Sequence, residues 1–264
     1  MHPRRALIIL LAACCCAIGF ALSTPLPTEA GISPNEAKAW HPDLAAAARF
    51  AESRSTDVSF AIYDMRDRLS AHEGERDYIM ASTFKVMLLV AYLRQAAGRD
   101  LTQNERDLLV PMIRESDNAS ATRVRDILGP GPIYRLADDA DMAGFAWSES
   151  WGLCRATPRD GARLMRRLRG LLPSRHRGFA LRQLESVIPR QRWGVAHVEP
   201  KGWDLAFKGG WGLRAYRVEH QVALLRHGKR RIGVSVLTQG NPSRRYGRAT
   251  LEGVYERLLK DLPR

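Results

Sequence analysis

The segment from Ser82 to Gln95 constrains the fold of this chain more than any other stretch. Its large apolar residues fall on every side of the helix that the segment would form: Val86, Met87, Leu88, Leu89, Val90, Tyr92 and Leu93. A helix without a polar face is stable only when other elements surround it. The segment is therefore predicted to be a central, buried helix, and 264 residues with 45% hydrophobic content are enough to cover it.

Patterns on both sides of this helix predict an α/β fold, specifically an α+β sandwich. Before it, a helix capped by Asp43 and ending near Glu52 is followed by a strand with Val58, Phe60 and Ile62, and by a turn at 64–68 into a second strand. After it come helical patterns at 102–115, 119–128 and 158–171, with a break at 129–132, then strands at 205–208, 216–225 and 231–238 and a closing helix at 249–262. Strands at both ends predict an antiparallel sheet of about five strands built from both termini, with flanking helices and an inserted helical lobe.

Residues 1–24 have the layout of an export signal. Arg4 and Arg5 precede an apolar run from Ala6 to Leu22, and polar, proline-containing sequence follows. Three interpretations remain open: a cleaved signal peptide, a lipid anchor on Cys14, and an uncleaved helical anchor. Each predicts a bacterial protein that is secreted or held in the cell envelope, with membrane contact only through this leader.

The rest of the chain is predicted to form a linker and one domain. The linker covers 25–40 and the domain 41–264. Within the domain, a sheet lobe is expected at 41–80 and 185–264 and a helical lobe at 81–184. We expect a monomer.

Cysteine and charge usage narrow the function classes. Cys14, Cys15 and Cys16 lie in the leader, so Cys154 is the single thiol of the domain and is expected to be buried and inert. No histidine cluster accompanies it, and no metal or cofactor is predicted. The formal net charge of +13 favours anionic partners such as wall polymers or lipid head groups. Because the arginines are scattered without an aromatic-interleaved stripe, a solvated basic surface is the simpler interpretation and no nucleic acid partner is expected.

Three short motifs follow one another along the chain. Ser82 and Lys85 form an S-x-x-K at the start of the buried helix, Ser116-Asp117-Asn118 follows a helix, and Lys208-Gly209-Gly210 ends a predicted strand. The first motif alone is expected by chance roughly 0.3 times in such a composition, but all three in order less than about once in a thousand chains. Only the set is a strong signal.

The chemistry of these residues suits nucleophilic catalysis. Positions i and i+3 share a helix face, so Lys85 can reach the Ser82 hydroxyl, which needs a base to become a good nucleophile. Burial on an apolar helix lowers the pKa of an ammonium group toward that of a useful base. The alternative is a lysine that extends along the helix end to water, and the presence of Asn118 and Lys208 argues against it.

The motif set resembles that of class A β-lactamases and penicillin-binding proteins. The resemblance extends from about Asp43 to the end of the chain, because Thr157-Pro158-Arg159-Asp160 is similar to the helix start that follows the family's Ω loop, and the last strand and helix also fit. The stretches 151–153, 193–194 and 208–211 look like those of actinobacterial serine hydrolases. The resemblance implies that fold and an acyl-serine mechanism, with a small-molecule or peptide substrate.

The resemblance also implies roles for individual residues. Ser82 would attack the substrate carbonyl and Lys85 would activate it, with the backbone N–H groups of Ser82 and Trp211 as the oxyanion hole. Ser116 would relay a proton to the leaving nitrogen, and Asn118 would orient Lys85 and the acyl amide.

Substrate binding would fall to the third motif and the strand after it. Lys208 would attract a substrate carboxylate, beside Gly209 and Gly210 in the wall of the site. Arg214 or Arg217 could hold the same carboxylate, or either could be an exposed arginine without a role.

Several features depart from the family pattern. The first two motifs lie closer together than is usual, so the helical lobe is shortened; Gly209 replaces a serine or threonine, and Trp211 puts a bulky ring at the mouth. The loop 144–158 lacks the family's E-x-x-L-N, whose acid activates water for deacylation. Glu149 is the only acid of that loop, and it is either a general base or a solvated loop residue.

Two main hypotheses follow. The first is an exported serine hydrolase in which Ser82 attacks a β-lactam or a related amide or ester, with deacylation slowed by the missing acid. The alternative is a non-hydrolytic penicilloyl-binding or wall-associated protein that keeps the fold and the site residues. A third, a basic envelope scaffold, leaves the motifs unexplained.

Overall fold

A five-stranded antiparallel sheet, in the order β2-β1-β7-β6-β5, forms the centre of the structure. The computed structural model describes residues 40–198, 200–212 and 215–263. The five strands are β1 (Asp57–Tyr63), β2 (Leu69–His72), β5 (Asp204–Gly212), β6 (Val218–His227) and β7 (Arg230–Gln239). The predicted sheet, with strands from both ends of the chain, is confirmed.

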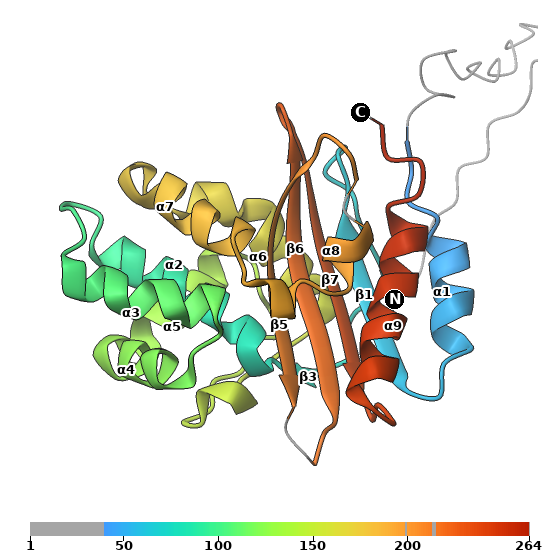
Figure 1. The fold of residues 1–264 in the computed structure, drawn as a ribbon, viewed down its shortest axis with the longest axis horizontal. Coiled ribbons are helices and arrows are strands. Elements are labelled where there is room, and N and C mark those ends of the chain that lie inside the picture. Colours follow the sequence, from blue (N-terminus) through green and yellow to red (C-terminus); the bar gives the residue numbers. More distant parts are fainter. Residues whose placement is uncertain (1–39, 199, 213–214, 264) are drawn as a thin grey trace, which may run out of the picture. The chain divides into compact units, whose positions relative to one another are not determined.

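Helices cover both faces of this sheet (Figure 1). One face carries α1 (Leu44–Glu52), α8 (Val195–Val198) and α9 (Arg244–Leu258). The other carries α2 (Lys85–Gln95), α3 (Gln103–Arg114), α4 (Asn118–Leu128), α5 (Pro130–Asp139), α6 (Pro158–Leu171) and α7 (Ser174–Glu185). The other described elements are a small two-stranded sheet of β3 (Tyr78–Ile79) and β4 (Arg155–Ala156) and three 3₁₀ turns, η1 (Ala81–Phe84), η2 (Trp151–Leu153) and η3 (Pro189–Gln191).

The sheet separates two hydrophobic cores. Successive side chains of a strand point to opposite faces, so Val222 and Leu224 of β6 join the core around α2, while Ala223 and Leu225 join the core under α1 and α9. In α2 every residue from Lys85 to Leu93 is buried. The prediction of a central helix without an exposed face is confirmed.

The end of one predicted strand is wrong in a way that matters for the site. Lys208-Gly209-Gly210 was predicted to end a strand, but β5 continues to Gly212, with Gly209 paired to Gln221 and Gly210 to His220. Glycine disfavours strands because it has no side chain to pack. Pairing with β6 overrides that local preference.

The predicted helices at 102–115, 119–128 and 158–171 match α3, α4 and α6 to within one residue, but two other helices begin where the sequence did not predict. Pro130, inside the predicted break, begins α5, because Gly129 with φ of 62° ends α4 and proline suits a first helical position. α7 has no counterpart among the predicted helices. The last helix begins at Arg244 rather than at 249, because the Ser243 side chain caps it by accepting a hydrogen bond from the Tyr246 N–H.

The predicted leader lies outside the described residues. Across the described part of the chain, no helix is both long enough and apolar enough to cross a membrane. Export, lipidation of Cys14 and an uncleaved anchor therefore stay predictions.

Close packing between α6 and β7 gives a test of this architecture. A methyl group at Gly233 would lie 2.4 Å from the Ala162 carbonyl oxygen and 2.6 Å from the Arg166 nitrogen. Gly233→Ala is therefore expected to lower the free energy of unfolding by about 1–3 kcal/mol, measured by urea denaturation. Gly98→Ala is the control, since nothing lies within 4 Å of the added methyl group. Equal stabilities of the two variants would contradict the packing described.

Candidate active site

Ser82 lies on a strained turn between β3 and α2. Ala81, just before it, has a φ of 46°, a left-handed conformation that is uncommon for a residue with a side chain. The turn is held by the Met80 N–H, which donates to the Cys154 carbonyl at 2.7 Å. Such strain persists only where the surrounding structure fixes it, and it is frequent at functional sites.

Lys85, fully buried, begins α2 directly after this turn. Its backbone N–H donates to the Ser82 carbonyl, a 3₁₀ bond that aligns residues three apart. The Lys85 Nζ donates to the Ser116 carbonyl at 2.6 Å, to the Ser116 Oγ at 3.1 Å and to the Asn118 Oδ1 at 2.8 Å. Among the described residues, no hydrogen bond joins this amine to the Ser82 hydroxyl. What the structure shows of the predicted pair is that Ser82 and Lys85 lie on the same turn.

The Ser116-Asp117-Asn118 turn is shaped to receive that amine. Ser116 has a φ of 59°, and its carbonyl and hydroxyl both accept from Lys85. Asp117 caps α4 by accepting from the Ser120 N–H at 2.7 Å, and Asn118 is the first residue of α4. The turn is braced from outside by Gln191, whose side chain donates to the Glu115 carbonyl at 2.6 Å.

A second amine reaches the same hydroxyl from the sheet. The Lys208 Nζ, fully buried, donates to the Ser116 Oγ at 3.0 Å and to the Gly209 carbonyl at 2.9 Å. Two lysine amines, one from α2 and one from β5, therefore share one serine hydroxyl. The structure brings together four of the five predicted catalytic side chains by hydrogen bonds, and Ser82 adjoins them through the turn.

Burial sets the protonation of both amines. Desolvation lowers the pKa of Lys85 to about 7, against a smaller opposing effect of the Asp117 carboxylate. Desolvation also lowers the pKa of Lys208 well below its usual value, and the neighbouring charge of Lys85 lowers it further. An amine that is partly neutral near pH 7 can act as a base.

The glycines of β5 allow the backbone to approach closely. A side-chain carbon on Gly210 would lie 3.0 Å from the Ser82 nitrogen and 3.0 Å from the Thr83 nitrogen. This places β5 against the turn that carries Ser82, with Trp211 following at once. Gly209 faces the other side of the strand, where a side-chain carbon would lie 2.8 Å from Cζ2 of Trp193.

A tryptophan ring stands beside each amine. The Lys85 Nζ is 4.9 Å from the ring centroid of Trp151, and the Lys208 Nζ is 5.4 Å from that of Trp211. Trp151 is oriented by its Nε1, which donates to the Thr122 Oγ1 at 3.1 Å. Aromatic faces attract ammonium groups and exclude water, so both rings help to define a dry site.

Two other predicted residues, Glu149 and Arg217, do not join this cluster. Glu149 is exposed, its carboxylate accepts from the Trp147 Nε1 at 3.1 Å, and its carbonyl accepts from Arg125. Arg217 is exposed at the start of β6, and Arg214 lies outside the described residues. Substrate contact by either arginine stays a prediction.

Four residues that support the site were given no role in it by the sequence, although the stretches 151–153 and 193–194 were noted there for their resemblance. Trp151, Trp193, Thr122 and Gln191 lie outside the three motifs, and their contacts depend on loops whose paths the sequence does not reveal. One signal was available for Trp193: a glycine in place of a hydroxyl residue at 209 leaves a space that a neighbour must fill.

Comparison with known proteins decides the family. A model of the beta-lactamase enzyme family, Beta-lactamase2, matches residues 98–260. The chain belongs to the beta-lactamase enzyme family. The matched segment contains Ser116, Asn118 and Lys208, while Ser82 and Lys85 precede it. No curated protein matches the sequence.

Solved beta-lactamases share the fold. The beta-lactamase of Sphaerobacter thermophilus is 21% identical, with a TM-score of 0.70 over 81% of this chain and 95% of that one. The class A beta-lactamase of Mycobacterium abscessus is 19% identical, with a TM-score of 0.70 over 82% and 98%. A beta lactamase of Xanthomonas campestris is 17% identical, with a TM-score of 0.71 over 83% of this chain and 96% of that one. These likenesses confirm the class A beta-lactamase fold, and family membership implies a small-molecule substrate.

The donor sets do not suggest a metal centre. In the described ranges no three His, Cys, Asp or Glu side chains gather as metal ligands would. The buried Cys154 thiol has its pKa raised to about 11 by desolvation, so it is a poor nucleophile near neutral pH.

The low pKa of Lys85 can be measured directly. With ¹³C-labelled lysine, one NMR resonance that is lost in Lys85→Met is expected to titrate near pH 7, far below the ordinary lysine value of 10.5. Asp117→Asn removes the carboxylate that favours the charged amine and keeps a helix cap, so the midpoint should move to lower pH. A midpoint that stays in place or rises would contradict the assigned electrostatics.

Proposed function

We propose that this family member is a serine hydrolase in which Ser82 forms an acyl-enzyme with a β-lactam or a related amide or ester. The observation that carries the proposal is the pair of buried amines on the Ser116 hydroxyl, next to the strained turn of Ser82. A neutral amine, a relay hydroxyl and a serine on a short turn are the parts that acyl transfer requires. A leader of the predicted kind would place this chemistry outside the cytoplasm.

The acylation step follows from these positions. Neutral Lys85 takes the proton of the Ser82 hydroxyl as the Ser82 Oγ bonds to the carbonyl carbon. The backbone N–H groups of Ser82 and Trp211 stabilise the oxyanion. The carbon–nitrogen bond then breaks, and the leaving nitrogen receives the proton of Ser116, which is replaced from the Lys85 ammonium.

The charge of the site favours an anionic substrate. Lys85 and Lys208 are buried together, and among the described residues the Asp117 carboxylate is the one negative charge that raises the pKa of Lys85. A substrate carboxylate near Lys208 would stabilise its charged form and compensate its lost hydration. The hydroxyl that many relatives would offer there is absent, because Gly209 backs onto Trp193.

Release of the acyl group is expected to be slow. Hydrolysis needs a base that activates water, and the ring of Trp151 occupies the side of Lys85 that faces the loop 144–158. Glu149 is turned to solvent and bonded to Trp147. The positions of Trp151 and Glu149 also favour the second candidate function, a penicilloyl-binding protein that becomes acylated and does not hydrolyse the acyl-enzyme.

Acylation can be tested with a fluorescent penicillin beside a chromogenic cephalosporin. The protein is expected to become labelled and to retain the label, with little colour formation, and Ser82→Ala should abolish labelling. Because protonation removes the base, the labelling rate should fall as the pH falls through about 7. Labelling that survives in Ser82→Ala would exclude the proposed nucleophile, and rapid colour formation by the wild-type protein would exclude slow release.

The role of Trp151 can be tested by supplying the missing acid. Trp151→Glu is expected to speed release of the label on the order of tenfold or more relative to Trp151→Gln, which has the same shape without a base. Glu149→Gln should leave release unchanged. If Glu149→Gln instead slows release, Glu149 is the base and the proposed role of Trp151 is wrong.

A further inference from the structure

An open, arginine-lined pocket lies at the far end of α6 from the serine site. α6 begins at Pro158, just after the loop that supports Ser82, and Arg169 lies eleven residues later, about 17 Å along the helix axis. The pocket has a volume of about 600 Å³. Its lining comes from α6, α7, β7 and the end of α5: Asp139, Arg166, Arg167, Arg169, Gly170, Leu171, Arg177 and Arg231.

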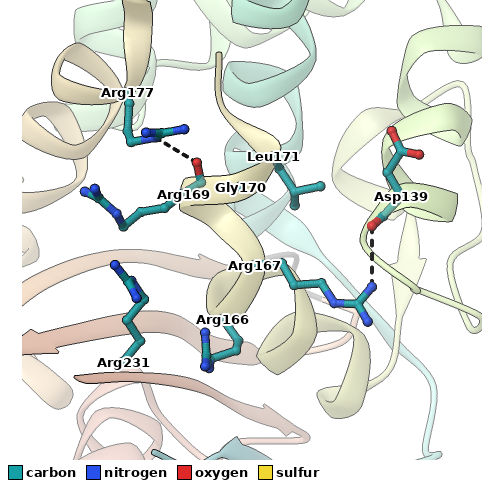
Figure 2. A pocket seen from close by; sticks show the side chains of 8 residues that line it. All are labelled: Asp139, Arg166, Arg167, Arg169, Gly170, Leu171, Arg177 and Arg231. Carbon is teal, nitrogen blue, oxygen red and sulfur yellow. Dashed lines mark hydrogen bonds between the residues drawn. The ribbon is translucent and has the colours of Figure 1, made fainter. Parts of the chain in front are cut away.

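The arginines of this pocket fall into two groups. Arg166 pairs with Asp67 outside the pocket, and Arg167 pairs with Asp141 at 3.5 Å. Figure 2 shows Arg167 pointing toward Asp139, whereas Arg169, Arg177 and Arg231 gather on the other side of the last turns of α6.

The second group lacks acidic partners within the described residues. Arg177 donates to two carbonyls at the end of α6, those of Arg169 at 2.8 Å and Leu172 at 3.4 Å. Arg231 donates to the Lys229 carbonyl at 3.1 Å. No carboxylate neutralises Arg169, and all three side chains are partly buried rather than spread into solvent.

Mutual repulsion makes this arrangement unfavourable without an anion. Desolvation and the charges of Arg231, Arg177 and Arg226 all lower the pKa of Arg169. A protein surface with a free choice of rotamers would separate such charges. Here the cations converge on a concavity, where a bound anion would relieve the repulsion.

We propose that the pocket formed by Arg169, Arg177 and Arg231 is a second binding site, for a small anion that carries phosphate groups. Guanidinium groups match phosphate oxygens with paired hydrogen bonds, and three of them suit more than one negative charge. The volume is that of a discrete ligand site. Because the arginines line a hollow and no aromatic side chain stands among them, a soluble phosphate compound fits better than a flat bilayer or a stacked nucleic acid base.

The test uses tripolyphosphate as the probe, with binding to the full protein measured by titration calorimetry. Arg169→Ala/Arg231→Ala is expected to weaken binding at least tenfold. Arg177 is left in place because it holds the end of α6. The control, Arg49→Ala/Arg245→Ala, removes the same charge from exposed positions on α1 and α9, across the sheet, and should change affinity less than twofold.

Two further arms separate the possible sources and roles. Phosphatidylglycerol vesicles that bind with the same dependence on Arg169 would identify a lipid head group as the phosphate source, and failure of the vesicles to bind would identify a soluble one. Ser82→Ala should bind tripolyphosphate unchanged, since this proposal is independent of the serine chemistry. Equal losses in the two double variants, or no saturable binding by the wild-type protein at millimolar probe, would overturn the proposal.

Discussion

The meeting of two lysine amines at the Ser116 hydroxyl is the interaction on which the rest of the site depends. Two buried ammonium groups would lose their hydration and repel each other, so their pKa values fall, and oxygens of Ser116, Asn118 and Gly209 accept their hydrogen bonds. The amines come from α2 and β5, and the hydroxyl from the turn before α4. This shared hydrogen bonding requires three features of the fold: the apolar α2, the left-handed backbone of Ser116 and the continuous β5.

Much of this arrangement could be predicted because it rests on local signals. The apolar segment after Ser82 predicts a buried helix, and the S-x-x-K and S-D-N motifs identify the polar side chains that lie beside it. Strand positions could be predicted because apolar residues alternate with polar or smaller ones along a strand, and this pattern is local in the sequence. The start of α9 and the full length of β5 could not be predicted, since a cap and a partner strand override the weak preferences of residues 244–248 and 209–212.

The surroundings of the amines could not be predicted for a different physical reason. The two rings that flank Lys85 and Lys208 are set by loop paths, and a loop path depends on contacts made across the whole domain. Trp151 reaches Lys85 because Thr122 of α4 holds its Nε1 and because η2 packs against η1. Sequence reasoning noted that the usual acid was missing from this loop, but it had no means to say that an indole stands beside the amine instead.

The contact between Gly209 and Trp193 limits which substitutions this protein can accept at either position. Any side chain at 209 would collide with the indole, so a serine or threonine fits there only if residue 193 is smaller. Loss of Trp193 first would open a void behind β5 and weaken the core under α9. Each single step is therefore unfavourable although the pair of changes need not be. The two positions are therefore coupled, and a tryptophan at 193 requires a glycine at 209.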